Sequence, residues 1–183
     1  MTLPTPFAIN ADTLTLRALR RTVFSIGSNL GDRWDHLEEA VLLLRNTPDL
    51  RITGVSPVYE TRAVGGPADS PDFLNAVVVA DTIQPAEALL ARAGAIEDAA
   101  DRTREVHWGP RTLDVDIIVY GDEVINTPDL TVPHPYAHQR AFVLAPWADV
   151  EPDAILPGHG PIRDLLAQVD TSGIHRLAET LDE

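Results

Sequence analysis

Two aspartates, Asp114 and Asp116, lie inside the otherwise apolar run "TLDVDIIVY" at residues 112–120. Side chains alternate along a β-strand, so both carboxylates should face the same side about 6–7 Å apart, while Leu113 and Val115 face the core. Two such carboxylates can hold one Mg²⁺, or two Mg²⁺ bridged by the phosphates of a ligand, because this ion prefers a few carboxylate oxygens together with phosphate oxygens. The simpler alternative is a pair of solvated aspartates on an exposed face.

Three arginines, Arg102, Arg104 and Arg111, stand just before this strand. The chain carries a formal net charge of −14, so bases gathered over residues 102–111 form a local site for anions. Phosphoryl transfer depends on positioning and charge neutralisation. It therefore needs carboxylates that hold cations next to arginines that hold phosphates. The alternative is that these arginines only pair with neighbouring acids, as surface arginines often do.

The sequence contains no lysine, so all 14 of its Lys and Arg residues are arginine. This excludes Schiff-base chemistry on a lysine, and it excludes the phosphate-binding lysine of a P-loop. If the protein handles phosphates, arginine and metal must do so. The planar guanidinium fork suits phosphate oxygens well.

Composition narrows the class of protein further. The chain has 183 residues, of which 44% are hydrophobic, and this fits one domain with a substantial core. It has no cysteine, no apolar run of roughly 20 residues and no secretory pattern at its N-terminus, which suits a cytoplasmic protein. The strong negative charge argues against a binder of nucleic acid or of anionic membranes.

The first strand and helix are expected near the N-terminus. Residues 22–27 read as a short strand, and the turn that follows offers Gly27 and Gly31 for positive φ angles. Asp32 can cap the next helix. Residues at helical spacing form the apolar face of that helix: Leu37, Ala40, Val41 and Leu44.

Further strands and a second helix follow. Residues 50–61 read as one strand and residues 73–82 as another, joined by a loop at 62–72 that is rich in Gly, Pro and Asp. Pro85 opens a helix, and the strand at 112–120 comes after it. The apolar face of this helix consists of Leu89, Leu90, Ala93, Ile96 and Ala100.

The C-terminal part reads less regularly. A short strand is expected around Val124 and Ile125, and residues 131–140 form an irregular segment rich in proline and histidine. Residues 141–150 are expected to be helical, and residues 162–170 to form a short amphipathic helix.

The order β-α-β-β-α-β predicts an α+β fold with a ferredoxin-like split βαβ core, in which helices back an antiparallel sheet. We expect a single domain over residues 21–183. Residues 1–20 match no strong pattern and are expected to form an N-terminal extension that could be flexible.

Five stretches resemble signatures of the 6-hydroxymethyl-7,8-dihydropterin pyrophosphokinases of folate biosynthesis. They are "SIGSNLGD", "VSPVYETRAVGG", "DFLNAVVVADT", "HWGPRTLDVDII" and "TVPHPYAHQRAFVLAP", and the resemblance runs from about residue 21 to residue 160. The block "GPRTLDVDI" is highly specific, and five matches in the family's order make chance agreement implausible.

The resemblance implies transfer of the terminal diphosphate of ATP to the hydroxymethyl oxygen of the pterin, with AMP and the pterin diphosphate as products. It implies that Asp114 and Asp116 hold two Mg²⁺ across the triphosphate, which would offset its charge and align the attack on the β-phosphorus. Arg102 and Arg111 would carry phosphate charge in the transition state.

A mobile loop is part of the same resemblance. Arg104 and Trp108 would belong to a loop that closes on the site and expels water, which competes as a nucleophile. The sequence departs from many family members at three positions, namely Asp101, His107 and His138. The first two put the dynamics of the loop in doubt, and His138, where some members carry lysine, puts one phosphate contact in doubt.

The family pattern also assigns residues to the two substrates. At ATP it places Glu97, Arg102, Arg104, Trp108, Arg111, Ile117, Thr131, His134 and Arg140. At the pterin it places Thr61, Val64, Phe73, Asn75, Trp108, Asp114 and Phe142, with Thr61 and Val64 acting through backbone groups. The amide of Asn75 would read the hydrogen-bonding edge of the ring, and Phe142 would stack on its face.

Without the resemblance, these residues have simpler interpretations. Glu97 reads as an acid on a helix surface, and His134 as an ordinary loop histidine. Phe73 and Phe142 read as core residues of a strand and of a helix start.

Two other functions compete with the enzyme. A non-catalytic binding module is one, because split βαβ domains often bind RNA or small effectors, although the charge has the wrong sign for RNA. A catalytically dead relative is the other, and it would have lost a key aspartate or arginine, which this sequence has not. As partners we expect only ATP and the pterin, without nucleic acid or membrane. We expect a monomer, with association with other folate-pathway enzymes as the alternative.

Overall fold

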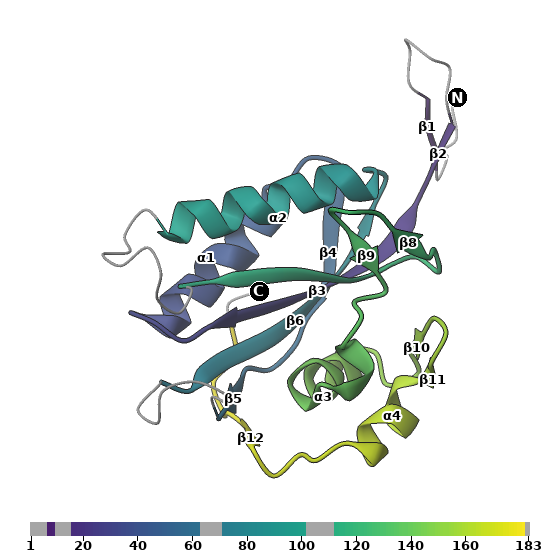
Figure 1. Cartoon of the computed structure of the whole chain (residues 1–183). Coiled ribbons are helices and arrows are strands. Elements are labelled where there is room, and N and C mark those ends of the chain that lie inside the picture. Colours follow the sequence, from purple (N-terminus) through teal and green to yellow (C-terminus); the bar gives the residue numbers. More distant parts are fainter. Residues whose placement is uncertain (1–6, 10–15, 63–70, 102–111, 182–183) are drawn as a thin grey trace.

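The computed structural model describes residues 7–9, 16–62, 71–101 and 112–181 of the chain. Its centre is an antiparallel sheet of six strands (Figure 1). These strands are β3 (Arg20–Ser28), β4 (Leu50–Val55), β5 (Tyr59–Thr61), β6 (Phe73–Thr82), β7 (Asp114–Tyr120) and β12 (Ile174–Arg176).

The order of the strands confirms the expected split βαβ core. β3 lies between β6 and β7, and β6 pairs on its other side with β4 and β5 in succession. Helix α1 (Arg33–Arg45) connects β3 to β4, and helix α2 (Ala86–Asp101) connects β6 to β7. This order of strands and helices is the α+β arrangement that the sequence pattern predicts.

The helices lie on both faces of the sheet. Helices α1 and α2 cover one face, and α3 (Ala141–Val150) and α4 (Ile162–Gln168) lie on the other side (Figure 1). Neighbouring residues of one strand therefore enter different cores: Phe24 packs under α1 and α2, whereas Val23 packs with Trp147 of α3. Burial on both faces explains why β3 and β6 read as nearly continuous apolar runs.

Several predicted details are confirmed. β6 spans the residues expected for it, and the expected apolar face of α1 is buried. The Asp32 side chain caps α1 by accepting a hydrogen bond from the Asp35 N–H at 3.1 Å. Gly31 has a φ of 65°, as its place in the turn predicts.

Two predictions were wrong. Residues 50–61 form two strands, β4 and β5, because Pro57 has no N–H and the Ser56 side chain takes over a ladder position by accepting the Val77 N–H at 2.8 Å. Gly27 is not in the turn but is paired within β3, where it lies opposite Asn75 and Asp114.

The strand expected around Val124 and Ile125 is present as β8, but the other short strands were missed because two or three residues leave little periodic pattern. Residues 1–20 contain the antiparallel pair β1 (Phe7–Ile9) and β2 (Leu16–Ala18). Two small pairs flank α3: β8 (Ile125–Asn126) with β9 (Thr131–Val132), and β10 (Ile155–Leu156) with β11 (Gly160–Pro161). A 3₁₀ turn, η1 (Ala137–Gln139), lies within the segment expected to be irregular.

Within the described ranges, no helix has the length and apolar character needed to cross a membrane.

Candidate active site

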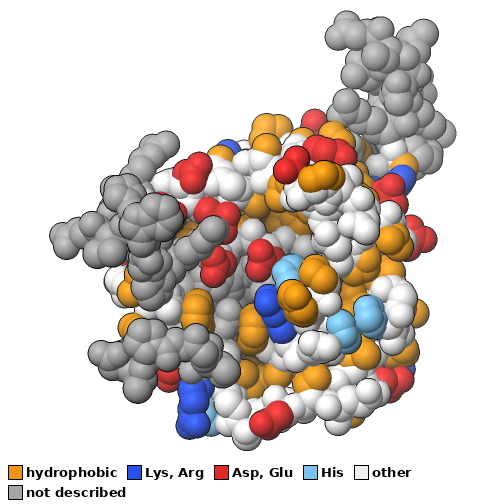
Figure 2. Space-filling model, viewed as in Figure 1, with side chains coloured by type: hydrophobic (Ala, Val, Ile, Leu, Met, Phe, Trp, Pro, Cys, Tyr) orange, Lys and Arg blue, Asp and Glu red, His pale blue; other side chains and the backbone are white. Residues whose placement is uncertain are grey.

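A cavity of about 350 Å³ opens on the sheet face that carries α3. On this face the strands change along their length from apolar residues that pack on α3 to polar residues that line the cavity. Figure 2 shows carboxylates and an arginine gathered on this side of the molecule. The lining residues are Ser25, Gly27, Thr61, Arg62, Phe73, Asn75, Asp114, Asp116, Arg140 and Phe142.

Asp114 and Asp116 both face this cavity from β7. Between them, Val115 points to the opposite face and is buried in the core under α1 and α2. The alternation predicted for this strand is therefore confirmed. The two carboxylates stay partly exposed while the strand that carries them is anchored by buried side chains on its other face.

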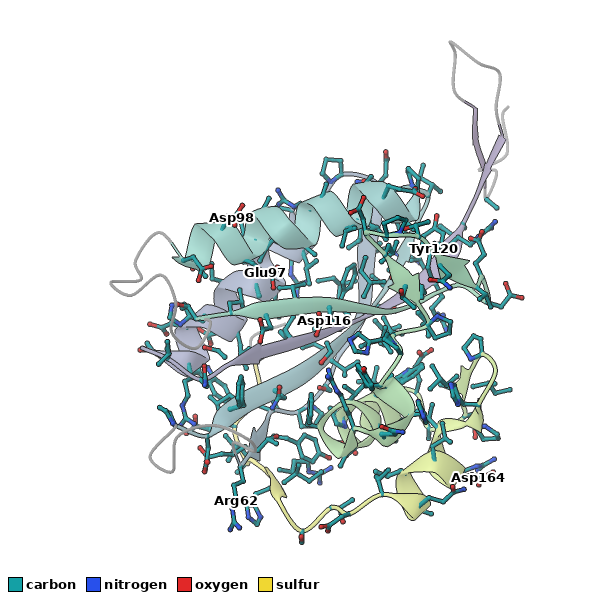
Figure 3. All side chains as sticks on the ribbon, viewed as in Figure 1. Arg62, Glu97, Asp98, Asp116, Tyr120 and Asp164 are labelled. Atoms are coloured by element: carbon teal, nitrogen blue, oxygen red, sulfur yellow. The ribbon has the colours of Figure 1, made fainter. Side chains whose placement is uncertain are left out.

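Two groups hold the outer edge of β7 in place. The Glu97 carboxylate of α2 accepts a hydrogen bond from the Val115 N–H at 3.1 Å, and the His134 N–H donates to the Ile118 carbonyl at 2.9 Å. Figure 3 shows Glu97 and Asp116 on the neighbouring elements α2 and β7. An edge strand is thereby kept in one position, and the aspartates with it.

His134 lies near Asp116 and Arg140, both of which act on its charge. Burial lowers the pKa of His134, the Asp116 carboxylate opposes that shift, and the Arg140 guanidinium adds to it. The ring Nδ1 accepts a hydrogen bond from the Tyr136 N–H at 3.2 Å. In the neutral ring the hydrogen must then be on Nε2, which leaves a donor for a ligand.

Arg140 provides the positive charge in this part of the cavity. Its Cζ lies 5.5 Å from the centre of the Tyr136 ring and 5.5 Å from the centre of the Phe142 ring. Cation–π contacts on both rings fix a guanidinium that would otherwise move freely. The cavity lining thus contains a positive group as well as the two carboxylates.

Asn75 is 4% exposed, and its amide lies at the opposite part of the cavity wall. Its Nδ2 donates a hydrogen bond to the Thr61 hydroxyl at 2.9 Å. A Cβ on Gly27 would lie 2.6 Å from Asn75 Oδ1, so only glycine leaves room for the amide over β3. A fixed amide offers a donor and an acceptor to a flat heterocycle.

The donor set of the cavity fits Mg²⁺ only in combination with a ligand. In the part of the chain that the structure describes, no group of three or more His, Cys, Asp or Glu side chains is placed to hold a metal alone. Asp114 and Asp116 provide hard oxygen atoms from one strand face, and phosphate oxygens would have to complete the coordination. That is the usual way in which Mg²⁺ binds at phosphoryl-transfer sites.

The other residues expected at the site have different positions. Ile117 is buried in the core under α1 and α2, so its side chain points away from the cavity and only its backbone is available. Thr131 is exposed on β9. Five expected residues fall outside the described ranges: Val64, Arg102, Arg104, Trp108 and Arg111.

Three residues of the cavity were not predicted from the sequence, namely Ser25, Gly27 and Arg62. A serine and a glycine inside the apolar run of β3 were a signal, because each interrupts the apolar pattern on one face. Arg62 follows β5 directly and had no comparable signal.

Sequence comparison identifies relatives of the chain. A family model described as 7,8-dihydro-6-hydroxymethylpterin-pyrophosphokinase matches residues 23–152. A protein of Pseudomonas aeruginosa named 2-amino-4-hydroxy-6-hydroxymethyldihydropteridine pyrophosphokinase is 40% identical over 159 residues, which cover 87% of this chain and 98% of the relative. A protein of the same name from Bacillus subtilis is 46% identical over 127 residues, 69% of this chain and 75% of the relative.

Some relatives are longer. The bifunctional protein FolKE of Lactococcus lactis is 41% identical over 155 residues, which cover 84% of this chain but 44% of that protein. Among solved structures, wild-type HPPK-DHPS of Plasmodium falciparum resembles the chain with a TM-score of 0.63 at 16% identity, covering 83% of this chain and 44% of the other. This chain therefore spans less than half of these two proteins, and the structural likeness at this identity concerns the fold.

Proposed function

The chain belongs to the 7,8-dihydro-6-hydroxymethylpterin-pyrophosphokinase family, and from this premise we propose that it catalyses the reaction of that family in folate biosynthesis. It is an ATP-dependent diphosphotransferase. The diphosphate of ATP passes to the hydroxymethyl oxygen of 6-hydroxymethyl-7,8-dihydropterin, and AMP leaves. The observation that carries the proposal is one cavity with a fixed amide on one wall and two carboxylates on another.

The pterin binds beside Asn75 in this proposal. The amide is buried and fixed by Thr61, so it reads the ring's edge with one donor and one acceptor. Phe73 and Phe142 supply apolar surface for the ring. The hydroxymethyl group then points toward Asp114 and Asp116, where the phosphates lie.

The nucleotide binds on the side of His134 and Arg140. Arg140 faces phosphate oxygens, and His134 donates from Nε2. Asp114 and Asp116 hold Mg²⁺ ions, two by the family pattern, which supply positive charge that offsets the triphosphate. Glu97 acts on this side through β7, because its carboxylate holds the Val115 N–H. Ile117 contributes through its backbone, and Thr131 contributes from its exposed position on β9.

The residues that lie outside the described ranges keep the roles that the sequence suggests. Arg102 and Arg111 neutralise phosphate charge in the transition state, where such charge stabilisation accelerates the reaction most. Arg104 and Trp108 help to cover the site, and Val64 contacts the pterin through its backbone. Residues 21–183 form the catalytic domain, with residues 1–20 as an extension.

The protein works as a monomer in the cytoplasm in this proposal, where ATP is plentiful. The bifunctional relatives FolKE and HPPK-DHPS join such a domain to a second one, which supports association with other folate-pathway enzymes as the alternative state. Sedimentation of the purified chain, alone and with substrates, distinguishes the two.

The identity of the nucleotide product tests the reaction. The protein is incubated with Mg²⁺-ATP and the reduced hydroxymethylpterin, and the nucleotides are separated after a fixed time. AMP in amounts equal to the pterin diphosphate is expected. ADP as the product would exclude diphosphate transfer, and no turnover at all would favour a binding module.

A further inference from the structure

The short strand β5 forms one wall of the cavity, so its position matters for the substrate. Thr61, its last residue, lines the cavity and accepts the hydrogen bond from Asn75. β5 pairs with β6 over three residues, from Tyr59 opposite Asn75 to Thr61 opposite Phe73. A ladder of this length holds a strand weakly, because isolated pairs of strands are only marginally stable in water.

The C-terminal strand β12 is the second neighbour of β5. The two strands pair antiparallel along the whole length of β5. The Arg62 N–H donates to the Gly173 carbonyl at 3.0 Å, immediately after Thr61. At the other end, the Leu177 N–H donates to the Val58 carbonyl at 2.8 Å. β5 is therefore held on both sides, and the pairing with β12 reaches the cavity.

Side chains tie β12 to the rest of the fold. Arg176 Nη1 lies 3.4 Å from Asp149 Oδ1 on α3, and the other oxygen of this carboxylate accepts the Tyr59 hydroxyl at 2.5 Å. Beyond the strand, Leu177 packs against the core under α1 and α2, and Leu181 lies within that core at 3% exposure. The segment is thus built into both sides of the sheet.

The match to the family model ends at residue 152, before this segment begins. We propose that β12 is a positioning element of the substrate site: its pairing with β5 holds Thr61, and through Thr61 the amide of Asn75, in place for the pterin. The inference rests on the proposed function of the same cavity. It predicts that loss of the β12–β5 pairing weakens pterin binding and leaves ATP binding unchanged.

His175 in the middle of β12 allows a sharp test. It lies opposite Glu60, and the alternation of the ladder puts this pair among those that exchange backbone hydrogen bonds. His175→Pro removes the N–H, whereas the matched control His175→Ala keeps it and changes only an exposed side chain. Calorimetry measures the affinity for the pterin in the presence of a non-hydrolysable ATP analogue. It also measures the affinity for the analogue alone.

We expect His175→Pro to bind the pterin about tenfold more weakly, with the affinity for the analogue changed less than twofold and with His175→Ala like the wild type. Amide hydrogen exchange at Arg62, whose N–H donates to the Gly173 carbonyl just before β12, should become faster in the proline variant. If Arg62 exchanges faster while the pterin still binds normally, the inference is overturned. Equal losses for both ligands would also overturn it, because β12 would then only stabilise the fold.

A second variant covers the case in which His175→Pro does not fold. Arg176→Ala removes the tie between β12 and α3 without changing the backbone, and the same two ligands and the same amide are measured. A loss for the pterin alone supports the inference, and unchanged pterin binding together with faster Arg62 exchange overturns it. Failure of the wild type itself to bind the pterin would instead contradict the proposed function.

Discussion

The Thr61 hydroxyl accepts a hydrogen bond from the side-chain amide of Asn75 at 2.9 Å, across the paired strands β5 and β6. This bond uses one donor of the amide and fixes its plane. The remaining amide hydrogen and the oxygen are then left for a ligand in a set orientation. Under the proposed function, this set orientation lets the amide read the edge of the pterin ring in one direction.

Asn75→Ala should weaken pterin binding by about 1–3 kcal/mol, because a buried polar partner is lost. Binding of a non-hydrolysable ATP analogue should stay the same. Calorimetry with each ligand separately measures both values. Asn126→Ala, which changes an exposed asparagine on β8, serves as the control. Equal losses for both ligands would mean that Asn75 has a structural role.

Gly27→Ala should reproduce the effect of losing the Asn75 amide without touching that residue. The new Cβ would lie 2.6 Å from Asn75 Oδ1, so the amide must move. Overpacking of this kind also lowers the free energy of unfolding, typically by about 1–3 kcal/mol. The measurements are pterin affinity and urea unfolding.

Gly94→Ala is the matched control for that variant. Gly94 lies on α2, and a Cβ there would meet nothing within 4 Å. The change should raise the free energy of unfolding by about 0.5–1 kcal/mol, since alanine is the better helix former, and should leave pterin binding alone. Normal pterin affinity in Gly27→Ala would contradict our account of how the amide is placed.

Asp114→Ala and Asp116→Ala should each lower turnover at least ~100-fold, by analogy with the loss of one preorganised electrostatic group. The fold should stay intact, because both side chains face the cavity and the core residues of β7 are unchanged. Turnover is measured over a range of Mg²⁺ concentrations, with Asp98→Ala on the exposed face of α2 as the control. Near-normal turnover in either variant would refute the assignment of that carboxylate.

The stability of the protein should depend on pH through His134. Its pKa is lowered in the folded state by burial, so the unfolded chain binds the proton more tightly than the folded one. The free energy of unfolding should fall as the pH drops below about 6.5, the ordinary value for histidine, until it passes the lowered pKa. His134→Asn should reduce this slope in urea unfolding between pH 5 and 8. Identical slopes would show that His134 is not the group responsible.

Arg102→Ala tests the role that the sequence gives to the arginines before β7. The rate of the chemical step should fall strongly, while affinity for ATP changes less than about tenfold, or 1.4 kcal/mol. An arginine that acts mainly in the transition state accelerates chemistry without tightening the ground state. Single-turnover quench experiments and equilibrium binding of an ATP analogue give the two values, and Arg163→Ala on α4 is the control. A loss in binding as large as the loss in rate would make Arg102 a ground-state phosphate ligand.

The sequence predicted the parts of the fold in which burial of one face makes apolar residues recur at a regular spacing. β6, α1 and the two faces of β7 follow from alternation or helical spacing, because each has a core-facing side that must be apolar. The break between β4 and β5 follows from a side-chain bond at Ser56 and from Pro57, and no periodicity reports such a bond. The pairing of β12 with β5 joins parts of the chain far apart in sequence, so local patterns could not reveal it.

Only some of the residues that line the cavity were predicted, because local patterns do not report contacts between separate strands. Asp114 and Asp116 were recognisable because acids inside a buried strand break its pattern. Gly27 was assigned to a turn, since its real function, leaving room for the Asn75 amide on the neighbouring strand, depends on the register between β3 and β6. Register is set by the whole sheet rather than by any single segment.

The pairing of β12 with β5 also sets an order in time. During synthesis Thr61 emerges roughly 110 residues before its partner Ile174, which is on the order of ten seconds at usual rates of translation. The ladder of β3 and β6 can form in that interval, but the outer side of β5 has no partner until residues 174–176 are made. A chain released early, after α4, would already contain both carboxylates of β7, yet the wall opposite them would be unfinished. Completion of this cavity wall thus waits for the synthesis of residues 174–176.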